Sequence, residues 1–425
     1  MEKILIKNGR LVDPANNIDE KRDILIEDGK IKEVADCIMQ VGDAKEINAE
    51  GKAVMPGFID LHVHLREPGF EYKETVETGA KAAARGGVTS ICPMPNTKPV
   101  IDSAESVKDL LKRAENSPVH ILPIGACTVG QEGKELADIE GMKEAGIVAL
   151  SEDGKSVMDS SLFRKSLKEA ARLNLPMFSH CEDKALVEGG VMNAGKKAKE
   201  LGLPGITNSV EDVIVARDII MSKEAGNRLH LCHCSTADSV VLVEMAKKQG
   251  LSVSAEVCPH HFTMSDDEIT EDNGRFKMNP PLRSRADVDA LKEGLKNGIM
   301  EVISTDHAPH GEEEKNQTML KAPFGIVGLE TSFALGYTEL VDKGVLTLSQ
   351  LVEKMSVNPA KVLGIDKGNL AQGKAADIVI ADITEEYEID SKKFVSKGKN
   401  TPFDGKKVKG RVITTIVDGK IVYHE

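Results

Sequence analysis

The alternation of apolar and polar residues divides the chain into two kinds of segment. Between about residues 56 and 368, short apolar runs typical of buried strands alternate with amphipathic stretches typical of helices. Eight apolar runs predict strands, at residues 57–65, 88–94, 120–127, 147–152, 176–180, 228–234, 252–258 and 302–306. Helices are predicted between most of them, including residues 103–116, 160–173, 210–225 and 236–249. This alternation predicts parallel βαβ units.

Eight such units fit a closed barrel better than an open sheet. A doubly wound open sheet would call for a glycine-rich phosphate-binding turn after an early strand, and the sequence has none. We therefore predict an α/β fold with a (β/α)8 TIM-type barrel at residues 56–368. In such a barrel, functional side chains lie at the carboxyl ends of the strands.

The two ends of the chain resemble each other and differ from the middle. Each carries β-branched runs around the tetrapeptide Asp-Gly-Lys-Ile, at residues 28–31 and 418–421. An Asp-Gly pair between such runs predicts a two-residue β-hairpin. We therefore predict that residues 1–55 and 369–425 form the two parts of one small β-sandwich-like domain.

Composition limits the environment and the partners of the protein. The formal net charge of −13 argues against nucleic acid or anionic membranes as partners, because binding phosphates needs clusters of Lys and Arg. No apolar run approaches the ~18–20 residues of a membrane span, and the sequence from Met1 lacks the features of a signal peptide. The seven cysteines follow no disulfide spacing. We therefore expect a soluble, cytoplasmic protein; a small anionic substrate remains compatible with these features.

Histidines gather where the predicted strands end. His62 and His64 are two residues apart on the first strand and so face the same way. Two imidazoles on one buried face are unfavourable unless a group such as a metal uses their lone pairs. The fifth strand ends at His180, and on the sixth His233 is closer to the carboxyl end than His230, which we expect to be structural. Any one of these histidines alone would be weak evidence, but four at three strand ends predict a metal site.

Two carboxylates complete the set. Asp306 ends the eighth strand, which neighbours the first in a closed barrel, and Asp153 ends the fourth. The adjacent Glu152 is expected to face the opposite way. Nitrogen and oxygen ligands suit Zn²⁺, and six of them exceed the needs of one tetrahedral ion, which suggests two ions with a bridging carboxylate. Cysteines next to the histidines should face away and are not expected to be ligands.

A metal pair of this kind predicts amide hydrolysis. Bound zinc lowers the pKa of a coordinated water towards ~7, and a nearby carboxylate can move its proton to a leaving nitrogen. The sequence has no Gly-x-Ser-x-Gly motif for a serine nucleophile. We therefore expect hydrolysis without a covalent intermediate.

The motifs around these residues resemble the amidohydrolase superfamily and, within it, the dihydroorotases of the long bacterial type. The resemblance covers essentially the whole chain, and is carried by residues 56–69, 94–97, 152–154, 179–182, 232–236, 278–283 and 305–310. Its most specific parts are His-x-His followed by Arg-Glu-Pro-Gly, and Asn-Pro-Pro-Leu-Arg. The resemblance implies reversible cyclisation of N-carbamoyl-L-aspartate to L-dihydroorotate in de novo pyrimidine (UMP) biosynthesis.

The resemblance also assigns roles to the metal-site residues. It implies that His62, His64 and Asp306 hold one zinc ion, that His180 and His233 hold the other, and that Asp153 bridges them. One or two ions per chain are compatible with these ligands, and two are expected. Asp306 would also be the catalytic general base and acid that serves a metal-bound hydroxide.

The substrate carboxylate needs charge-assisted donors outside the metal centre. Arg66, two residues after His64, suits this role, and the family pattern adds Asn96 and His310. Asn279 would contact the amide edge of the ring, because a side-chain amide both donates and accepts hydrogen bonds.

A charged segment at residues 311–321 is expected to form a loop at the rim and is a candidate lid. Beyond it, the backbone near Pro323 and Gly325 is expected to face the substrate. Arg283 is left open between a substrate ligand and a partner in a scaffold ion pair.

Two alternative functions remain open. Hydantoinases, dihydropyrimidinases and allantoinases act on related cyclic amides, but Arg66 and Asn96 favour a substrate with a carboxylate. Hydantoinases and dihydropyrimidinases bridge their metals with a carbamylated lysine, whereas here the position holds Asp153 and Lys155 should lie out of reach. An inactive scaffold for aspartate transcarbamoylase would be expected to have lost metal ligands. A homodimer is expected, and aspartate transcarbamoylase is a possible partner.

Overall fold

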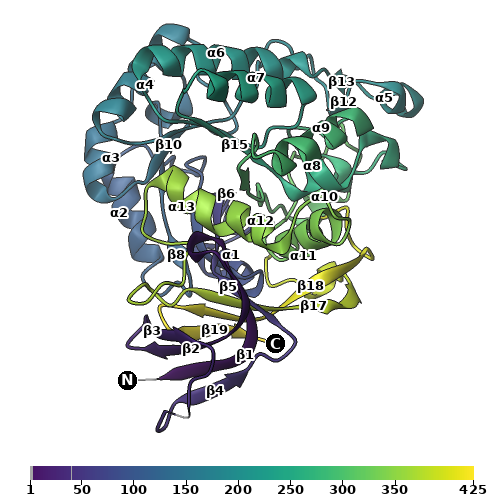
Figure 1. The fold of residues 1–425 in the computed structure, drawn as a ribbon. Helices are drawn as coiled ribbons and strands as arrows, with labels where there is room; N and C mark the ends of the chain where they lie inside the picture. The colour runs from purple at the N-terminus through teal and green to yellow at the C-terminus, as the bar shows by residue number, and fades with distance from the viewer. Residues whose placement is uncertain (1–2, 40) are drawn as a thin grey trace.

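Parallel strands follow one another around a barrel in the middle of the chain (Figure 1). The structure is a computed structural model that describes residues 3–39 and 41–425. Neighbouring barrel strands pair in parallel. In chain order they are β6 (Phe58–Val63), β7 (Val88–Pro93), β8 (His120–Ile121), β9 (Ile124–Ala126), β10 (Ala149–Ser151), β11 (Met177–Ser179), β14 (Leu229–Leu231), β15 (Val253–Val257) and β16 (Val302–Ile303).

The barrel closes at two irregular seams. β8 and β9 are the two halves of the strand predicted at 120–127, and they are separated at Pro123, which has no N–H to donate to a ladder. At the other seam, Val63 and His307 form a parallel bridge, and the His64 N–H donates to the carbonyl of His307 over 2.8 Å. The predicted TIM-type barrel is confirmed.

Helices surround the barrel, and the four helices predicted by residue range are confirmed to within a few residues. The longer ones are α1 (Val76–Arg85), α2 (Ala104–Arg113), α3 (Ile139–Ala145), α4 (Ser160–Arg172), α6 (Ser209–Ala225), α7 (Ala237–Lys248) and α9 (Arg285–Lys296). The shorter ones are α5 (Lys196–Leu201), α8 (Pro259–Thr263), α10 (Glu312–Lys315), α11 (Ser332–Gly336), α12 (Leu348–Val352) and α13 (Asn358–Leu363). Within the described ranges, no helix has both the length and the hydropathy that crossing a membrane requires.

N-terminal caps made by side chains explain where several of these helices begin. Thr75 caps α1 and Ser103 caps α2, each accepting a hydrogen bond from a backbone N–H of the first turn. Such caps satisfy donors that have no partner inside the helix.

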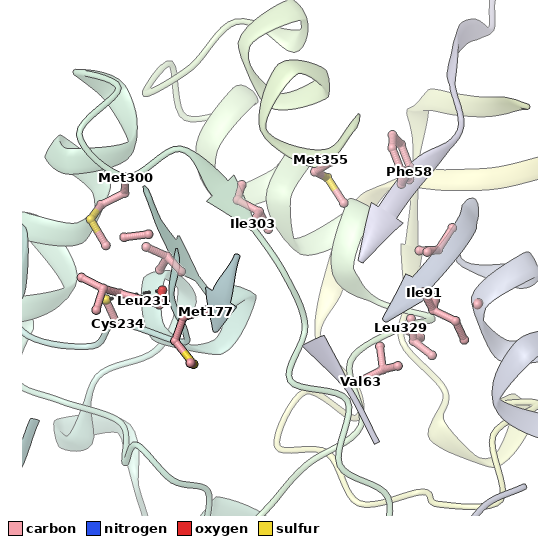
Figure 2. Packing of buried hydrophobic residues seen from close by; sticks show 14 of the residues in the cluster. Phe58, Val63, Ile91, Met177, Leu231, Cys234, Met300, Ile303, Leu329 and Met355 are labelled. Atoms are coloured by element: carbon pink, nitrogen blue, oxygen red, sulfur yellow. Dashed lines mark hydrogen bonds between the residues drawn. The ribbon is translucent and has the colours of Figure 1, made fainter. Parts of the chain in front are cut away.

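Apolar side chains fill two layers of the barrel. Those that point inward include Ile59, Leu61 and Phe178, which belong to one buried cluster. Their sequence neighbours point outward and pack under the helices; Met177 and Leu231 are examples in Figure 2. Alternation along each strand therefore sends one set of residues into the barrel and the other to the helical layer.

Both ends of the chain join one eight-stranded sheet, below the barrel in Figure 1. Its strands are β1 (Ile4–Asp13), β2 (Ile18–Glu27), β3 (Lys30–Ala35), β4 (Lys45–Asn48), β5 (Ala53–Pro56), β17 (Ile378–Glu388), β18 (Lys407–Val417) and β19 (Lys420–His424). The two ends meet where β5 pairs antiparallel with β17. Residues 1, 2 and 40 of the expected N-terminal part lie outside the described residues. A separate two-stranded ladder joins β12 (Met192–Asn193) to β13 (Gly205–Ile206).

The two predicted Asp-Gly hairpins are confirmed. Asp28 and Gly29 connect β2 to β3 with φ angles of 53° and 77°, and Asp418 and Gly419 connect β18 to β19 with 47° and 73°. Positive φ at both central residues is the geometry of a type I′ turn, which matches the twist of the flanking strands. The sheet curls so that apolar residues of its two halves share one buried cluster.

Candidate active site

The six predicted metal-site residues meet at the carboxyl ends of the barrel strands. His64 and Asp153 lie just beyond β6 and β10, and both are buried. His233 and Asp306 have positive φ angles of 34° and 49°, which are uncommon for residues other than glycine. These left-handed residues turn the chain after the strands end, so strand alternation alone does not place their side chains.

The histidines and carboxylates form two groups that share Asp153. Nε2 of His62 lies 3.2 Å from Asp153 Oδ1, and Nε2 of His64 lies 3.5 Å from Asp153 Oδ2. In the second group, Nδ1 of His180 and Nε2 of His233 are 2.8 Å apart and lie 3.4 and 3.8 Å from Asp153 Oδ1. Asp306 Oδ1 is 3.0 Å from His64 Nε2 and 3.5 Å from His62 Nε2. Asp153 thus belongs to both groups.

The donor set fits a divalent cation. Nε2 of His62 and Oδ1 of Asp153 are buried, and neither makes a hydrogen bond. His62 donates through Nδ1 to the carboxylate of Glu256 over 2.9 Å, so its Nε2 presents a lone pair to two carboxylates. Lone pairs that face each other in a buried site need a positive charge between them. Sequence analysis did not single out Glu256, which lies near the carboxyl end of β15.

Asn96 fixes His64 in the same way. Its Nδ2 donates to Asp153 over 3.2 Å, because a carboxylate only accepts, and its Oδ1 therefore faces Nδ1 of His64 at 2.9 Å. His64 then points the lone pair of Nε2 at Asp306. Asn96 was predicted as a substrate ligand; it lines the cavity and also orients two metal-site residues.

The pKa values show how strongly the site favours positive charge. Burial opposes protonation of His62, but Asp153 and Asp306 outweigh it and raise the pKa of His62 well above its ordinary value. Burial likewise opposes ionisation of Asp306, but the charge of His62 and the contact with His64 lower the pKa of Asp306 to about 2. Both shifts have the same cause: the carboxylates of Asp153 and Asp306 lie close to the imidazoles and favour positive charge beside them.

Three neighbours of the site behave as predicted. The carboxylate of Glu152 turns away from the cavity and accepts hydrogen bonds from the backbone N–H groups of Cys127 and Thr128. Lys155 is exposed and does not line the cavity. His230 also faces away from the cavity, into the barrel, where Nε2 donates to Glu256 over 3.1 Å.

A cavity of about 250 Å³ opens over the metal-site residues. Arg66 lines it with a φ of 62°, and its Nε donates to the carbonyl of Pro309 over 3.2 Å. The cavity has both polar and apolar walls and holds the half-buried guanidinium of Arg66 beside the metal-site carboxylates. Its lining comprises His64, Arg66, Asn96, Asp153, Gly154, His180, Glu182, Val187, His233, Asn279, Asp306, Ala308, Phe324 and Gly325.

Known proteins resemble this chain over its full length. A family profile described as Dihydro-orotase-like matches residues 51–239. A dihydroorotase of Syntrophus aciditrophicus is 49% identical over 425 residues, covering 100% of both chains. A dihydroorotase of Pelotomaculum thermopropionicum is 50% identical over 423 residues, covering 100% of this chain and 99% of its own. This chain belongs to the dihydroorotase family.

Solved structures of a hydantoinase and a dihydropyrimidinase share the fold of this chain. The L-hydantoinase (dihydropyrimidinase) of Arthrobacter aurescens superposes with a TM-score of 0.88 at 29% identity, covering 100% of this chain and 96% of its own. A dihydropyrimidinase of Brevibacillus agri gives a TM-score of 0.86 at 26% identity, covering 99% and 95%.

Within this member of the dihydroorotase family, His310 lies behind Arg66. Nε2 of His310 donates to the carbonyl of Phe324 over 2.8 Å, and Nδ1 accepts from Lys73 over 3.1 Å. Burial, together with the charges of Arg66 and Lys73, lowers the pKa of His310 to about 2. His310 is therefore a neutral imidazole that supports Arg66 and Phe324 at the wall of the cavity.

The remaining predicted ligands divide into two outcomes. Asn279 lines the cavity and donates through Nδ2 to Glu182, a carboxylate at the same wall that the sequence did not single out. Gly325 lines the cavity with a φ of 131°. Pro323 does not line it: its carbonyl accepts from Nζ of Lys315 over 2.9 Å, so its backbone is engaged on the far side of the loop.

Buried cations anchor the rim and the scaffold. Lys315, in the predicted rim loop, also donates to the carbonyl of Lys277 over 2.9 Å, and burial lowers its pKa to about 7. Arg283 lies outside the cavity and donates to Ser235, Asn193 and the carbonyl of Ile206. Of the two roles left open for Arg283, the structure supports the scaffold one.

Proposed function

We propose that this chain catalyses the reversible cyclisation of N-carbamoyl-L-aspartate to L-dihydroorotate and water, in de novo pyrimidine synthesis. The observation that carries the proposal is one cavity, in which Arg66 lies beside three of the four metal-site histidines and both metal-site carboxylates. The full-length relatives named dihydroorotase support it.

We infer that the centre binds zinc, with two ions expected. His62, His64 and Asp306 would hold one ion, His180 and His233 the other, with Asp153 between them. The imidazole and carboxylate donors match zinc, and the unpartnered His62 Nε2 and Asp153 Oδ1 support a cation there. When bound, the ions would lower the pKa of water and polarise the ring amide carbonyl.

Asp306 is the residue that moves the proton. Its low pKa keeps it ionised at neutral pH, so it can accept a proton from the attacking water. It would then deliver that proton to the ring nitrogen as the amide bond breaks. In the biosynthetic direction it would take the proton from the ureido nitrogen and return it to the departing water.

Arg66 is proposed to bind the substrate carboxylate by charge-assisted hydrogen bonds. Asn96 would contribute a second donor, and Asn279 would contact the amide edge of the ring. The backbone at Gly325 would complete the pocket, and His310 would support Arg66 from behind. Because Arg66 would need an anionic partner, these contacts favour dihydroorotate over substrates with a neutral ring.

We also propose a cytoplasmic homodimer. All seven cysteines are free thiols, and six are buried, which suits a reducing compartment.

Four apolar side chains lie exposed on two neighbouring helices, Val213 and Ile220 on α6 and Val241 and Met245 on α7. A second copy would cover this patch by two-fold pairing. Light scattering of the wild-type protein tests this proposal, and a monomeric wild type would reject it. Ile220→Glu should weaken the dimer. A further sample with aspartate transcarbamoylase added tests for that partner.

A hydantoinase-type activity is the second candidate, because the L-hydantoinase of Arthrobacter aurescens shares the fold. The test is turnover of L-dihydroorotate by zinc-supplemented protein, with hydantoin, dihydrouracil and allantoin assayed in parallel. Turnover of dihydroorotate alone is expected. Turnover of a neutral ring instead would select the second candidate, and a metal-loaded protein inactive on all four would favour a scaffold role.

A further inference from the structure

Glu256 lies inside the barrel on β15, and its side chain has no exposed surface. It accepts three hydrogen bonds. Oε1 accepts from Nδ1 of His62 over 2.9 Å and from the backbone N–H of His233 over 3.1 Å, and Oε2 accepts from Nε2 of His230 over 3.1 Å. A buried carboxylate is unfavourable unless it is well hydrogen-bonded, and these donors satisfy that condition.

The hydrogen bond to Glu256 decides which nitrogen of His62 is free. An ionised carboxylate only accepts, so Nδ1 of His62 carries the proton and Nε2 keeps its lone pair. That lone pair faces Oδ1 of Asp153 at 3.2 Å and Oδ1 of Asp306 at 3.5 Å. Without Glu256, the proton could occupy either nitrogen and the ring could rotate away.

The same carboxylate reaches both halves of the centre. His62 belongs to one group of metal-site residues, and His233, whose backbone Glu256 holds, belongs to the other. His233 has a φ of 34°, so its backbone needs support to stay in that conformation. His230 holds Glu256 in turn, and its Nδ1 lies 2.9 Å from the hydroxyl of Ser254. This chain of contacts gives His230 a role although it faces away from the cavity.

We propose that Glu256 is a positioning residue for the metal centre, which fixes His62 as an Nε2 ligand and holds the backbone at His233. The inference rests on the proposed function, because it assumes that the mouth of the barrel binds a divalent ion. Partner carboxylates of this kind orient histidine ligands and raise their basicity.

The test is the zinc affinity of Glu256→Gln, measured on the full-length, metal-stripped protein by competition with a chelator. We expect zinc to bind roughly 10–100-fold more weakly than to the wild type. With Co²⁺ in place of zinc, the visible absorption bands should shift, because the orientation of His62 changes. Neither measurement needs substrate.

Glu330→Gln is the matched control. Glu330 is also a buried carboxylate with three donors, the backbone N–H groups of Val395 and Ser396 and the guanidinium of Arg85, but it contacts no histidine. Glu330→Gln should leave zinc affinity and the Co²⁺ spectrum unchanged, even if it lowers the melting temperature by as much as Glu256→Gln does.

Glu256→Asp covers the case in which Glu256→Gln does not fold. It keeps the charge but withdraws the carboxylate by one methylene, so we expect a smaller loss of zinc affinity. Wild-type affinity and spectrum in either folded Glu256 variant would overturn the positioning role. A wild-type protein that binds no zinc would instead reject the proposed function itself.

Discussion

Two clusters of buried histidines lie at the ends of barrel strands, and they differ in their surroundings. The mouth cluster comprises His62, His64, His180, His233, Asp153 and Asp306. The second cluster, Cys258, His260 and His261, follows β15, and its ligand-type atoms also lie within 4.8 Å of one another. Proximity of histidines is therefore common to both clusters and does not distinguish them.

The difference lies in charge and access. In the mouth cluster, carboxylates raise the pKa of His62, and the side chains face a cavity. In the second cluster, burial raises the pKa of the Cys258 thiol and lowers the pKa of His261 to about 4, so both groups are neutral. No carboxylate belongs to that group. We conclude that buried carboxylates, more than clustered histidines, make the mouth a site for cations.

The largest expected effect is on turnover. Asp306→Asn removes the proton acceptor and should lower kcat by about 10²–10⁴-fold, since general acid–base catalysis contributes that much. Far-ultraviolet circular dichroism should show an unchanged fold. Glu152→Gln, a buried carboxylate at the same rim that faces away, should keep substantial turnover. Appreciable activity in Asp306→Asn would require a different base.

The next effect separates the two clusters directly. His180→Ala removes a ligand from the mouth cluster and should lose about one of two bound zinc ions, because only His233 and the shared Asp153 would remain to hold the second ion. His261→Gln changes the second cluster and should bind as much zinc as the wild type. Elemental analysis of both purified variants measures this. Equal zinc loss in the two would mean that the comparison is wrong.

A smaller effect is expected on substrate binding. Arg66→Met should raise KM roughly 10–100-fold, because a charge-assisted pair with the substrate carboxylate is lost. Zinc content should not change. Arg283→Lys, a buried cation outside the cavity, should leave KM within about two-fold. An unchanged KM in Arg66→Met would remove Arg66 from the substrate pocket.

The smallest effect concerns stability against pH. The pKa of His261 is about 4 in the folded chain and ~6.5 when unfolded, so the unfolded chain binds more protons between these values. Its contribution is therefore present above pH 6.5 and is lost as the pH falls towards 4, by about 1.4 kcal/mol per pH unit. Urea unfolding of metal-free protein should show a shallower loss in His261→Gln. Parallel pH profiles would contradict the burial of a neutral His261.

Regular patterns in the sequence predicted much of the fold. The period of the apolar runs identified the barrel strands, and the Asp-Gly pairs identified both hairpins, because these features depend on local geometry. The interruption at Pro123 was missed, although proline is a signal for it. Arg283 could not be assigned, because its partners Ser235, Asn193 and Ile206 come from distant segments.

The site was predicted less completely than the fold. The ends of the predicted strands placed the histidines and Asp153 near one another. Three site residues, Arg66, His233 and Asp306, reach the cavity through positive φ angles, and residue type alone does not predict such angles. Glu256 was missed because a carboxylate within a strand gives no sign of which strands it faces. Its partner His62 lies 194 positions away in the sequence, and only the closed barrel brings the two together.

The central claim is that cations bind at the mouth and not at the second cluster. Anomalous scattering at the zinc absorption edge, from crystals grown with zinc, tests it most directly. We expect anomalous density within about 2.0–2.2 Å of the imidazole nitrogens of the mouth cluster, beside Asp153. We expect none among Cys258, His260 and His261. Zinc at the second cluster, or a mouth that stays empty at saturating zinc, would contradict it.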